Sequence, residues 1–284
     1  MNTTTTAASA GTTTIGGDLT VRRLGFGGMR LCGQGVWGLP ADPQNALAVL
    51  RRAVELGVNF IDTADAYGPN VNEEQIAQAL HPYPRDLVIA TKGGSTRSGP
   101  GQWGRDARPE RLKRCCDESL QRLRLERIDL YQLHSVDPNV PWDEQVGALR
   151  DLRDAGKIRH VGLSNVNVEQ LRDAEKIVPI ASVQNHYNVS NREHEDVLEY
   201  CVREGLAFIP YFPLDGGDIP EMKPLAAIAK THGATAYQIA LAWLLKRSPV
   251  MLPIPGTQSL AHLQENVGAG AIELSDSEFA LLSN

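Results

Sequence analysis

Helix-type and strand-type segments alternate along almost the whole of this chain. Stretches with Leu, Ala and Val at three- and four-residue spacing each lead into a short β-branched run, as QNALAVLRRAVELG leads into VNFID. Such alternation implies right-handed βαβ crossovers and a parallel sheet. Eight units within about 260 residues favour a closed, eight-stranded parallel (β/α)8 barrel. A doubly wound open sheet is the alternative, but GFGGMR lacks the third glycine of the motif that usually opens it.

The eight expected strands are the runs RLGFGGMRL, VNFID, LVIATK, IDLYQLH, IRHVGLSN, ASVQN, LAFIPY and VMLPIPG. Gly57, Gly156 and Gly205 are expected to end the helices before three of these strands, because glycine is common just past a helix C-terminus. Residues 1–17 are rich in Thr, Ala and Gly and predict a disordered tail. Residues 18–284 show no break in composition and predict one barrel domain.

Composition excludes several classes of protein. The 284 residues are 42% hydrophobic and 22% charged, as expected for a globular chain with a large core. A net charge of -6 without basic runs argues against nucleic-acid and membrane partners. No signal peptide or membrane span is visible, and the four cysteines are too irregular for a disulfide framework. We therefore expect a soluble, cytoplasmic protein, and we predict no metal site.

Four ionisable residues lie at or just after the ends of apolar runs in the first half of the chain. Asp62 and Tyr67 belong to VNFIDTADAYG, Lys92 to LVIATKGG and His134 to IDLYQLHSVDP. Because parallel strands end at one rim of a barrel, these groups are expected to meet there. The remaining strand ends in order carry Gly28 and Met29, Ser164 and Asn165, Gln184 and Asn185, Tyr211, and Pro255 and Gly256.

Each of these residues also has a purely structural interpretation. Asp62 and Lys92 suit a structural ion pair, and His134 suits a local hydrogen bond. Asn165 suits a helix cap, and Tyr211 suits packing at the rim. Polar groups or glycines at eight successive strand ends are much less expected by chance, so we favour a functional site.

The matching segments FIDTADAYG, ATKGG, YQLH, GLSN, VQNHYN, PYFPL and IPGTQSLAHLQEN identify a family resemblance. From about Arg22 to Leu282 the chain resembles the aldo-keto reductase superfamily, and within it the short bacterial branch that includes pyridoxal reductases. The resemblance implies a (β/α)8 barrel, usually monomeric, that binds a nicotinamide coenzyme without a Rossmann domain. It also implies reversible hydride transfer between that coenzyme and a small carbonyl substrate or its alcohol.

The chemistry of carbonyl reduction gives each of the four residues a role. Hydride addition puts negative charge on the carbonyl oxygen, so a proton donor must be aimed at it. Tyr67 is the expected acid, and Lys92 is expected to lower its pKa by stabilising the phenolate. Asp62 is expected to hold Lys92 charged and in place. His134 is expected to orient the carbonyl or to share the proton transfer in the oxidation direction.

The resemblance also implies coenzyme contacts. Tyr211 would stack on the nicotinamide, and Leu214 and Gly216 would follow the pyrophosphate. The remaining expected contacts are Gly28 and Met29 near the ribose, Ser164, Asn165 and Gln184 at the carboxamide, and Gly256, Thr257, Ser259, His262, Glu265 and Asn266 around the adenosine. Asp62 is also counted among the coenzyme contacts.

The chain departs from the family pattern in two respects. Many members carry Lys in place of Gly256 and Arg in place of His262, and those cations grip the coenzyme 2′-phosphate. Thr257, Ser259, His262 and a helix N-terminus can still bind a phosphate, so NADPH is the expected coenzyme and NADH a possible one. The long C-terminal loop that closes the pocket in larger members is also missing. Trp37 and Trp103 are candidates for lining the pocket.

Two other functions stay open on the sequence alone. A coenzyme-binding regulatory subunit of the same fold would bind the coenzyme with little turnover, although the intact tetrad argues against it. A barrel lyase or isomerase could use IPGTQS as a phosphate loop, but such a site would not explain Tyr67 beside Lys92.

Overall fold

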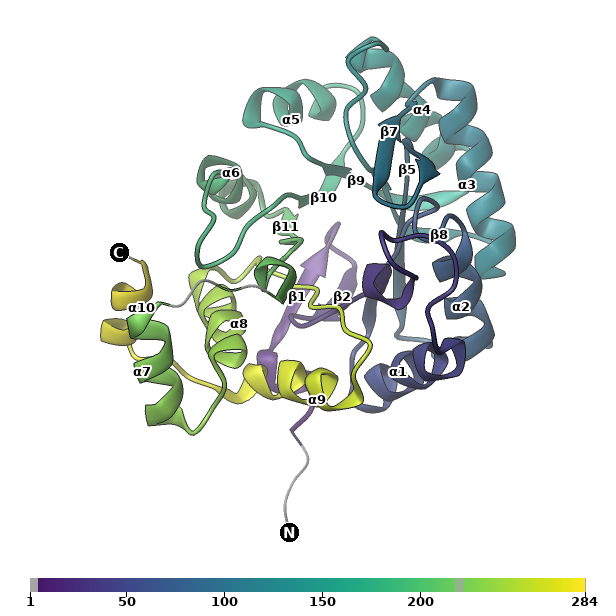
Figure 1. The fold of residues 1–284 in the computed structure, drawn as a ribbon. Helices are drawn as coiled ribbons and strands as arrows, with labels where there is room; N and C mark the ends of the chain where they lie inside the picture. The colour runs from purple at the N-terminus through teal and green to yellow at the C-terminus, as the bar shows by residue number, and fades with distance from the viewer. Residues whose placement is uncertain (1–4, 218, 220–221, 284) are drawn as a thin grey trace.

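Parallel strands form a curled sheet at the centre of the molecule (Figure 1). The computed structural model describes residues 5–217, 219 and 222–283. Seven strands pair in the order β11-β10-β9-β8-β5-β4-β3. They are β3 (Phe26–Gly27), β4 (Phe60–Asp62), β5 (Val88–Gly93), β8 (Ile128–Leu133), β9 (Ile158–Ser164), β10 (Ile180–Gln184) and β11 (Ala207–Phe208).

Residues 250–253 take the place of the expected eighth strand and close the ring. The backbone N–H of Phe208 donates to the carbonyl of Val250 at 2.9 Å, and that of Gly25 donates to the carbonyl of Pro253 at 3.0 Å. The segment thereby joins β11 to the chain just before β3. Because Pro253 has no N–H to donate, the segment cannot form a regular ladder on both sides. The predicted (β/α)8 barrel is confirmed, and the open-sheet alternative is wrong.

Helices cover the outside of the ring, and α7 and α10 lie outside α8 (Figure 1). Gly57, Gly156 and Gly205 have φ values of 85°, 72° and 69°, which confirms the predicted ends of three helices. The helices are α1 (Pro43–Glu55), α2 (Val71–Leu80), α3 (Pro109–Leu123), α4 (Trp142–Asp154), α5 (Val168–Glu175), α6 (Glu195–Glu204), α7 (Lys223–His232), α8 (Ala236–Arg247), α9 (Leu260–Gly268) and α10 (Asp276–Ser283).

The N-terminal segment is folded, so the prediction of a disordered tail over residues 1–17 is wrong for the part that the structure describes. A short 3-10 helix, η1 (Ala7–Ala10), precedes the antiparallel hairpin of β1 (Thr12–Ile15) and β2 (Leu19–Arg22). Ile15 packs in one cluster with Phe60 and Leu130 of the barrel strands. The Thr-rich composition of the segment gave no sign that Ile15 would pack in the barrel core. Residues 1–4 of the predicted tail lie outside the described residues.

A second hairpin follows β5 and was not expected from the sequence. It consists of β6 (Ser95–Gly99) and β7 (Gln102–Arg105), which pair antiparallel. Figure 1 shows it in front of the barrel strands beside β5. Two short 3-10 segments, η2 (Gly28–Leu31) and η3 (Asp215–Gly217), come after β3 and β11, and a third, η4 (Ala269–Ala271), follows α9.

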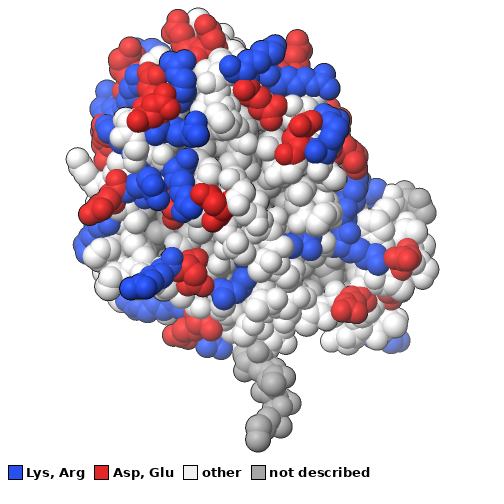
Figure 2. Space-filling model, turned by 180° about the vertical axis from the view of Figure 1, so that it is seen from behind, with Lys and Arg blue, Asp and Glu red and all other residues white. Residues whose placement is uncertain are grey.

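Positive and negative side chains are interspersed on the surface seen from behind (Figure 2). On this face Lys and Arg alternate with Asp and Glu, and no broad patch of one sign stands out. Within the described part of the chain, every helix is too short or too polar to cross a bilayer.

Candidate active site

Three neighbouring strands bring Asp62, Lys92 and His134 to one rim of the barrel. Asp62 ends β4, Lys92 lies near the end of β5, and His134 follows β8 directly. The strands are parallel and in register, with Lys92 paired to Gln132 of β8. Tyr67 comes from the loop between β4 and α2. The structure therefore brings together all four residues that the sequence singled out as catalytic.

Lys92 is the centre of this group. Its Nζ donates to Asp62 Oδ1 at 2.5 Å, to the carbonyl of Thr63 at 2.9 Å and to the Tyr67 hydroxyl at 3.3 Å. The side chains of Lys92 and Asp62 are 0% and 2% exposed. A buried ammonium is tolerated only when paired and hydrogen-bonded, and here all three of its protons have acceptors.

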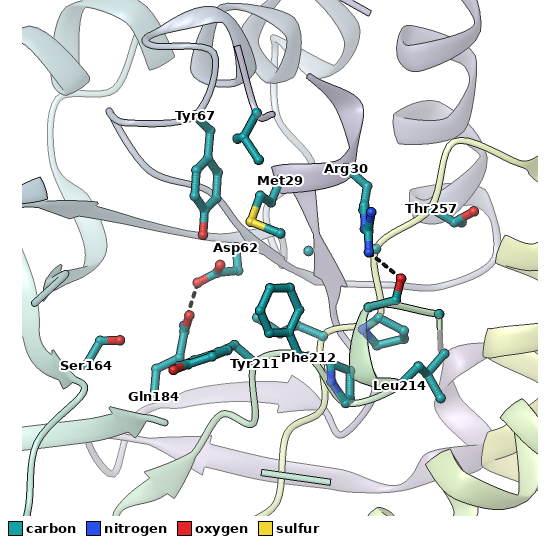
Figure 3. A pocket seen from close by; sticks show the side chains of 18 of the residues that line it. Met29, Arg30, Asp62, Tyr67, Ser164, Gln184, Tyr211, Phe212, Leu214 and Thr257 are labelled. Atoms are coloured by element: carbon teal, nitrogen blue, oxygen red, sulfur yellow. Dashed lines mark hydrogen bonds between the residues drawn. The ribbon is translucent and has the colours of Figure 1, made fainter. Parts of the chain in front are cut away.

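The second oxygen of Asp62 is held by two amides. Asp62 Oδ2 accepts from Gln184 Nε2 at 2.8 Å (Figure 3) and from Gln132 Nε2 at 3.2 Å. Gln184 was predicted to contact the coenzyme, and its amide nitrogen also holds the carboxylate of Asp62 in place. Gln132 was missed by sequence reasoning, although a polar residue inside the apolar run IDLYQLH was a signal for it.

The surroundings of Tyr67 favour the neutral phenol. Burial raises its pKa above 10.0, and the ammonium of Lys92 opposes this without reversing it. The prediction that Lys92 leaves Tyr67 with a lowered pKa is therefore wrong in its net direction. Burial alone would lower the pKa of Lys92, but Asp62 and Tyr67 raise it above 10.5. The pair consists of a phenol that keeps its proton beside a fully charged ammonium.

His134 is a neutral imidazole next to Tyr67. Burial lowers its pKa well below 6.5, and the positive charges of Lys92 and Arg97 act in the same direction. Its ring lies edge-on to that of Tyr67, with centroids 5.8 Å apart. No described residue makes a hydrogen bond with its buried Nδ1. A neutral ring can donate one hydrogen bond, which suits the orienting role expected from the sequence.

A cavity of about 920 Å³ opens beside these four residues. Its volume is at the upper end of the usual range for small-molecule sites, roughly 300–1,000 Å³. Tyr67 and His134 line it, whereas Lys92 lies behind them. The predicted coenzyme-binding residues that line it are Met29, Asp62, Ser164, Asn165, Gln184, Tyr211, Leu214, Gly216, Gly256, Thr257, His262, Glu265 and Asn266.

Gly28 and Ser259 are the two predicted coenzyme contacts that do not line the cavity. A Cβ added to Gly28 would lie 2.1 Å from Asn72 Oδ1, so this glycine permits close packing against α2. Ser259 is the N-cap of α9, where its hydroxyl accepts from the backbone N–H of His262 at 3.3 Å. Close packing accounts for glycine at position 28, and helix capping accounts for serine at position 259.

Tyr211 has one ring face covered inside the protein. It stacks on His186 with centroids 5.3 Å apart and planes 9° apart. Its hydroxyl donates to Asn165 Oδ1 at 2.8 Å, which fixes the ring from a second direction. Since Tyr211 also lines the cavity, this rigid aromatic surface is suited to stack on a planar ring there.

The segment 211–217 crosses the cavity and is tied down on two sides. Arg30 donates to the carbonyl of Gly216 (Figure 3), and the Tyr237 hydroxyl donates to the carbonyl of Gly217 at 2.9 Å. Both donors line the cavity, and both were missed by sequence reasoning. The position of Arg30, one residue past the strand-end pair predicted at 28 and 29, was a signal for it.

The two tryptophans proposed for the pocket have different positions. The Trp103 ring lines the cavity, with its centroid 6.4 Å from that of Tyr67 and 5.9 Å from that of His134. Trp37 is not among the residues that line the cavity; its ring centre lies 5.9 Å from the guanidinium of Arg97 instead. Among the described residues, no three His, Cys, Asp or Glu side chains meet in a way that could hold a metal ion.

Almost the whole chain matches a known protein family. The Aldo/keto reductase family model matches residues 23–284. An uncharacterized oxidoreductase of Schizosaccharomyces pombe is 48% identical over 279 residues, which cover 97% of this chain and 90% of that protein. Pyridoxine 4-dehydrogenase of Escherichia coli is 40% identical over 280 residues, which cover 96% and 98% respectively.

Solved structures agree with the sequence comparisons. The crystal structure of an aldo-keto reductase from Klebsiella pneumoniae in complex with NADPH aligns with a TM-score of 0.80 and 29% identity. The alignment covers 95% of this chain and 93% of that one. Together with the buried Tyr, Lys and Asp and the adjoining His at the rim of a (β/α)8 barrel, these matches show that the chain belongs to the aldo-keto reductase family of oxidoreductases.

Proposed function

We propose that this protein is an NADPH-dependent reductase that converts aldehydes and ketones to alcohols, with Tyr67 as the general acid. The observation that carries the proposal is the position of the Tyr67 hydroxyl, 3.3 Å from the buried Nζ of Lys92 at the edge of a cavity of about 920 Å³. The reaction class is that of the NAD(P)-dependent alcohol oxidoreductases, EC 1.1.1.-.

Each of the four rim residues has a separate task in this reaction. The bound coenzyme supplies the hydride. Tyr67 gives its proton to the carbonyl oxygen as negative charge develops there. Lys92 stabilises the phenolate that remains, and Asp62 keeps Lys92 charged and fixed in position. Neutral His134 donates a hydrogen bond that orients the carbonyl oxygen toward Tyr67.

The residues along the cavity fit a nicotinamide coenzyme. Tyr211 offers a fixed aromatic face, and Ser164 and Asn165 at the end of β9 offer groups for the carboxamide. Arg30 brings a cation to the middle of the cavity beside Gly216 (Figure 3). A relative of this fold is solved with NADPH, which supports the same coenzyme here. NADH is the weaker alternative.

The deciding experiment follows the loss of reduced-nicotinamide absorbance with a panel of small and aromatic aldehydes. Pyridoxal belongs in the panel because one relative is named pyridoxine 4-dehydrogenase. Tyr83→Phe is the matched control for Tyr67→Phe, since the Tyr83 hydroxyl bonds only to the carbonyl of Leu123 among described residues. Coenzyme binding without turnover of any aldehyde would instead indicate the regulatory-subunit alternative. We also predict that the protein is monomeric and cytoplasmic. Size-exclusion chromatography tests the oligomeric state.

A further inference from the structure

The hairpin of β6 and β7 presents one face to the cavity beside Tyr67. In its register Ser95 lies opposite Arg105, and Arg97 lies opposite Trp103. Side chains alternate along a strand, so these four residues share one face of the hairpin. Ser95, Trp103 and Arg105 all line the cavity. Two of the four residues on this face are therefore arginines.

Arg97 carries a charge that no carboxylate neutralises within the described residues. Its guanidinium donates to backbone carbonyls, among them those of Val36 at 2.8 Å and Ala66 at 3.1 Å. Its central carbon also lies 3.8 Å from the ring centre of Trp103. The cation–π contact holds Trp103 in place and leaves the positive charge uncompensated.

Arg105 is exposed, and its side chain makes no hydrogen bond or ion pair in the part of the chain that the structure describes. The neighbouring Asp106 does not neutralise it. The carboxylate of Asp106 bonds to Arg108 at 2.7 Å and lies 3.9 Å from Arg111. Arg105 thus presents five free donors at the wall of the cavity.

Acidic groups that could compensate this charge lie elsewhere in the cavity. Of its described lining residues, only Asp62 and Glu265 are acidic, and Asp62 is already paired with Lys92. Glu265 belongs to α9, which Figure 1 shows on the opposite side of the barrel from β7. The wall formed by the hairpin therefore has a positive potential that attracts anions.

We propose that the substrate is a carbonyl compound with an anionic group, a carboxylate or a phosphate ester, which Arg105 binds while its carbonyl oxygen meets Tyr67. This rests on the proposed reductase function and defines its substrate class. A guanidinium fork matches both anions in a bidentate geometry. Trp103, fixed by Arg97, offers an aromatic edge for the part of the substrate between the two ends.

The test compares aldehydes that differ only in the anionic group. One pair is 4-carboxybenzaldehyde and benzaldehyde, and the other is pyridoxal 5′-phosphate and pyridoxal. We expect wild-type kcat/KM to be at least about tenfold higher for the anionic member of one pair. The pair that shows this preference tells whether the anion is a carboxylate or a phosphate ester. Arg105→Gln should reduce that preference by roughly 5- to 30-fold, mainly through KM, and leave the neutral aldehydes unchanged.

Two further variants separate a direct contact from a general effect of charge. Arg127→Gln removes the same charge just before β8, at the opposite end of the barrel, and should leave the preference unchanged. Arg105→Lys should restore part of it, because an ammonium keeps the charge but not the fork.

Equal kcat/KM for both members of each pair, or an unchanged preference in Arg105→Gln, would overturn the substrate class while the reductase function stands. If no aldehyde is turned over, the reductase function fails. In that case tryptophan fluorescence measures how tightly 4-carboxybenzaldehyde and pyridoxal 5′-phosphate bind to the NADP+ complex. These affinities test whether Arg105 binds an anion. Weaker binding in Arg105→Gln than in Arg127→Gln supports it, and equal binding refutes it.

Discussion

The hydroxyl oxygen of Tyr67 lies 3.3 Å from the Nζ of Lys92, and both side chains are buried. Burial keeps the pKa of Tyr67 above 10.0 despite the neighbouring cation. In the proposed reaction, the phenol therefore keeps its proton until a carbonyl oxygen gains charge. The ammonium is already in place to stabilise the phenolate that forms, so no solvent rearrangement is required at that moment.

Replacing Tyr67 with Phe removes the proton donor and leaves the ring. We expect turnover of aldehydes to fall by about 10²–10⁴, the usual scale for a lost general acid. The dissociation constant of NADPH should change little, and Tyr83→Phe should behave as wild type. Steady-state kinetics and fluorescence titration measure the two quantities. Turnover near the wild-type value in Tyr67→Phe would contradict the mechanism.

Lys92→Met should abolish measurable reduction and also destabilise the fold. Without Lys92, the buried carboxylate of Asp62 keeps, among the described residues, only the amides of Gln132 and Gln184. Breaking a buried pair in this way typically costs about 3–5 kcal/mol. Urea denaturation gives the stability, and circular dichroism shows whether the variant is folded. Lys92→Arg should fail as well, because the wider guanidinium does not fit the space of an ammonium. Full activity in either folded variant would make Lys92 purely structural.

The rate of carbonyl reduction should be nearly independent of pH between about 7 and 9. The pKa of His134 lies well below 6.5, so its ring stays neutral over this range. The pKa of Tyr67 lies above 10.0, so the acid stays protonated and activity declines only as pH rises beyond that value. The dependence of kcat/KM on pH, measured over this range and beyond 10.0, tests both the constant rate and the decline at high pH. A fall in rate centred near pH 8 would show that Tyr67 ionises more easily than its burial implies.

Asp65 lies buried beside Glu73, and burial together with that carboxylate raises its pKa from 3.8 to about 7. The folded protein holds this proton more tightly than the unfolded chain, so its contribution to stability is lost as pH rises from 3.8 to about 7. Asp65→Asn removes the ionisable group with little change of shape. We expect it to be more stable than wild type at pH 8 by roughly 2–4 kcal/mol, with a smaller gain at pH 5.

Urea denaturation at both pH values measures the effect of Asp65→Asn. Asp86→Asn, at an exposed carboxylate, is the matched control and should change little at either pH. A gain of the same size at pH 5 and pH 8 would show that Asp65 does not titrate in this range.

NADPH should bind more tightly than NADH by about 10- to 100-fold, or 1.4–2.7 kcal/mol. Thr257 and His262 line the cavity next to the start of α9, whose N-terminal N–H groups favour a phosphate. Thr257→Ala and His262→Gln should each reduce the ratio, while Lys230→Gln on α7 serves as a control. Fluorescence titrations with both coenzymes measure the ratio, and tighter binding of NADH by the wild type would reverse the assignment.

The positions of the predicted catalytic groups followed from the sequence because strand ends are fixed by the barrel. A polar residue at the end of an apolar run must appear at the rim, and this rule placed Asp62, Lys92 and His134. The same rule placed most of the predicted coenzyme contacts in the cavity. It could not place Arg105, because the hairpin that carries Arg105 is an insertion between β5 and α3 whose direction no barrel periodicity defines.

Two other errors have physical causes. The sign of the Tyr67 pKa shift depends on how burial compares with a nearby charge, and a sequence gives neither the depth nor the distance. The N-terminal segment has the composition of a disordered tail. Its folding depends on Ile15 fitting among side chains from strands that are distant in the sequence, and such a fit leaves no local signal.

The hairpin of β1 and β2 closes the end of the barrel that lies away from the rim. Its Ile15, Leu19 and Val21 share a packed layer with residues of β4, β5, β8, β10 and β11 at the end away from the rim. Molecules that reach Tyr67 must therefore arrive and depart by the same opening, past the hairpin of β6 and β7 and the segment 211–217. Substitutions in those two segments should alter the rates of entry and release, whereas substitutions at the strand ends should alter the chemical step.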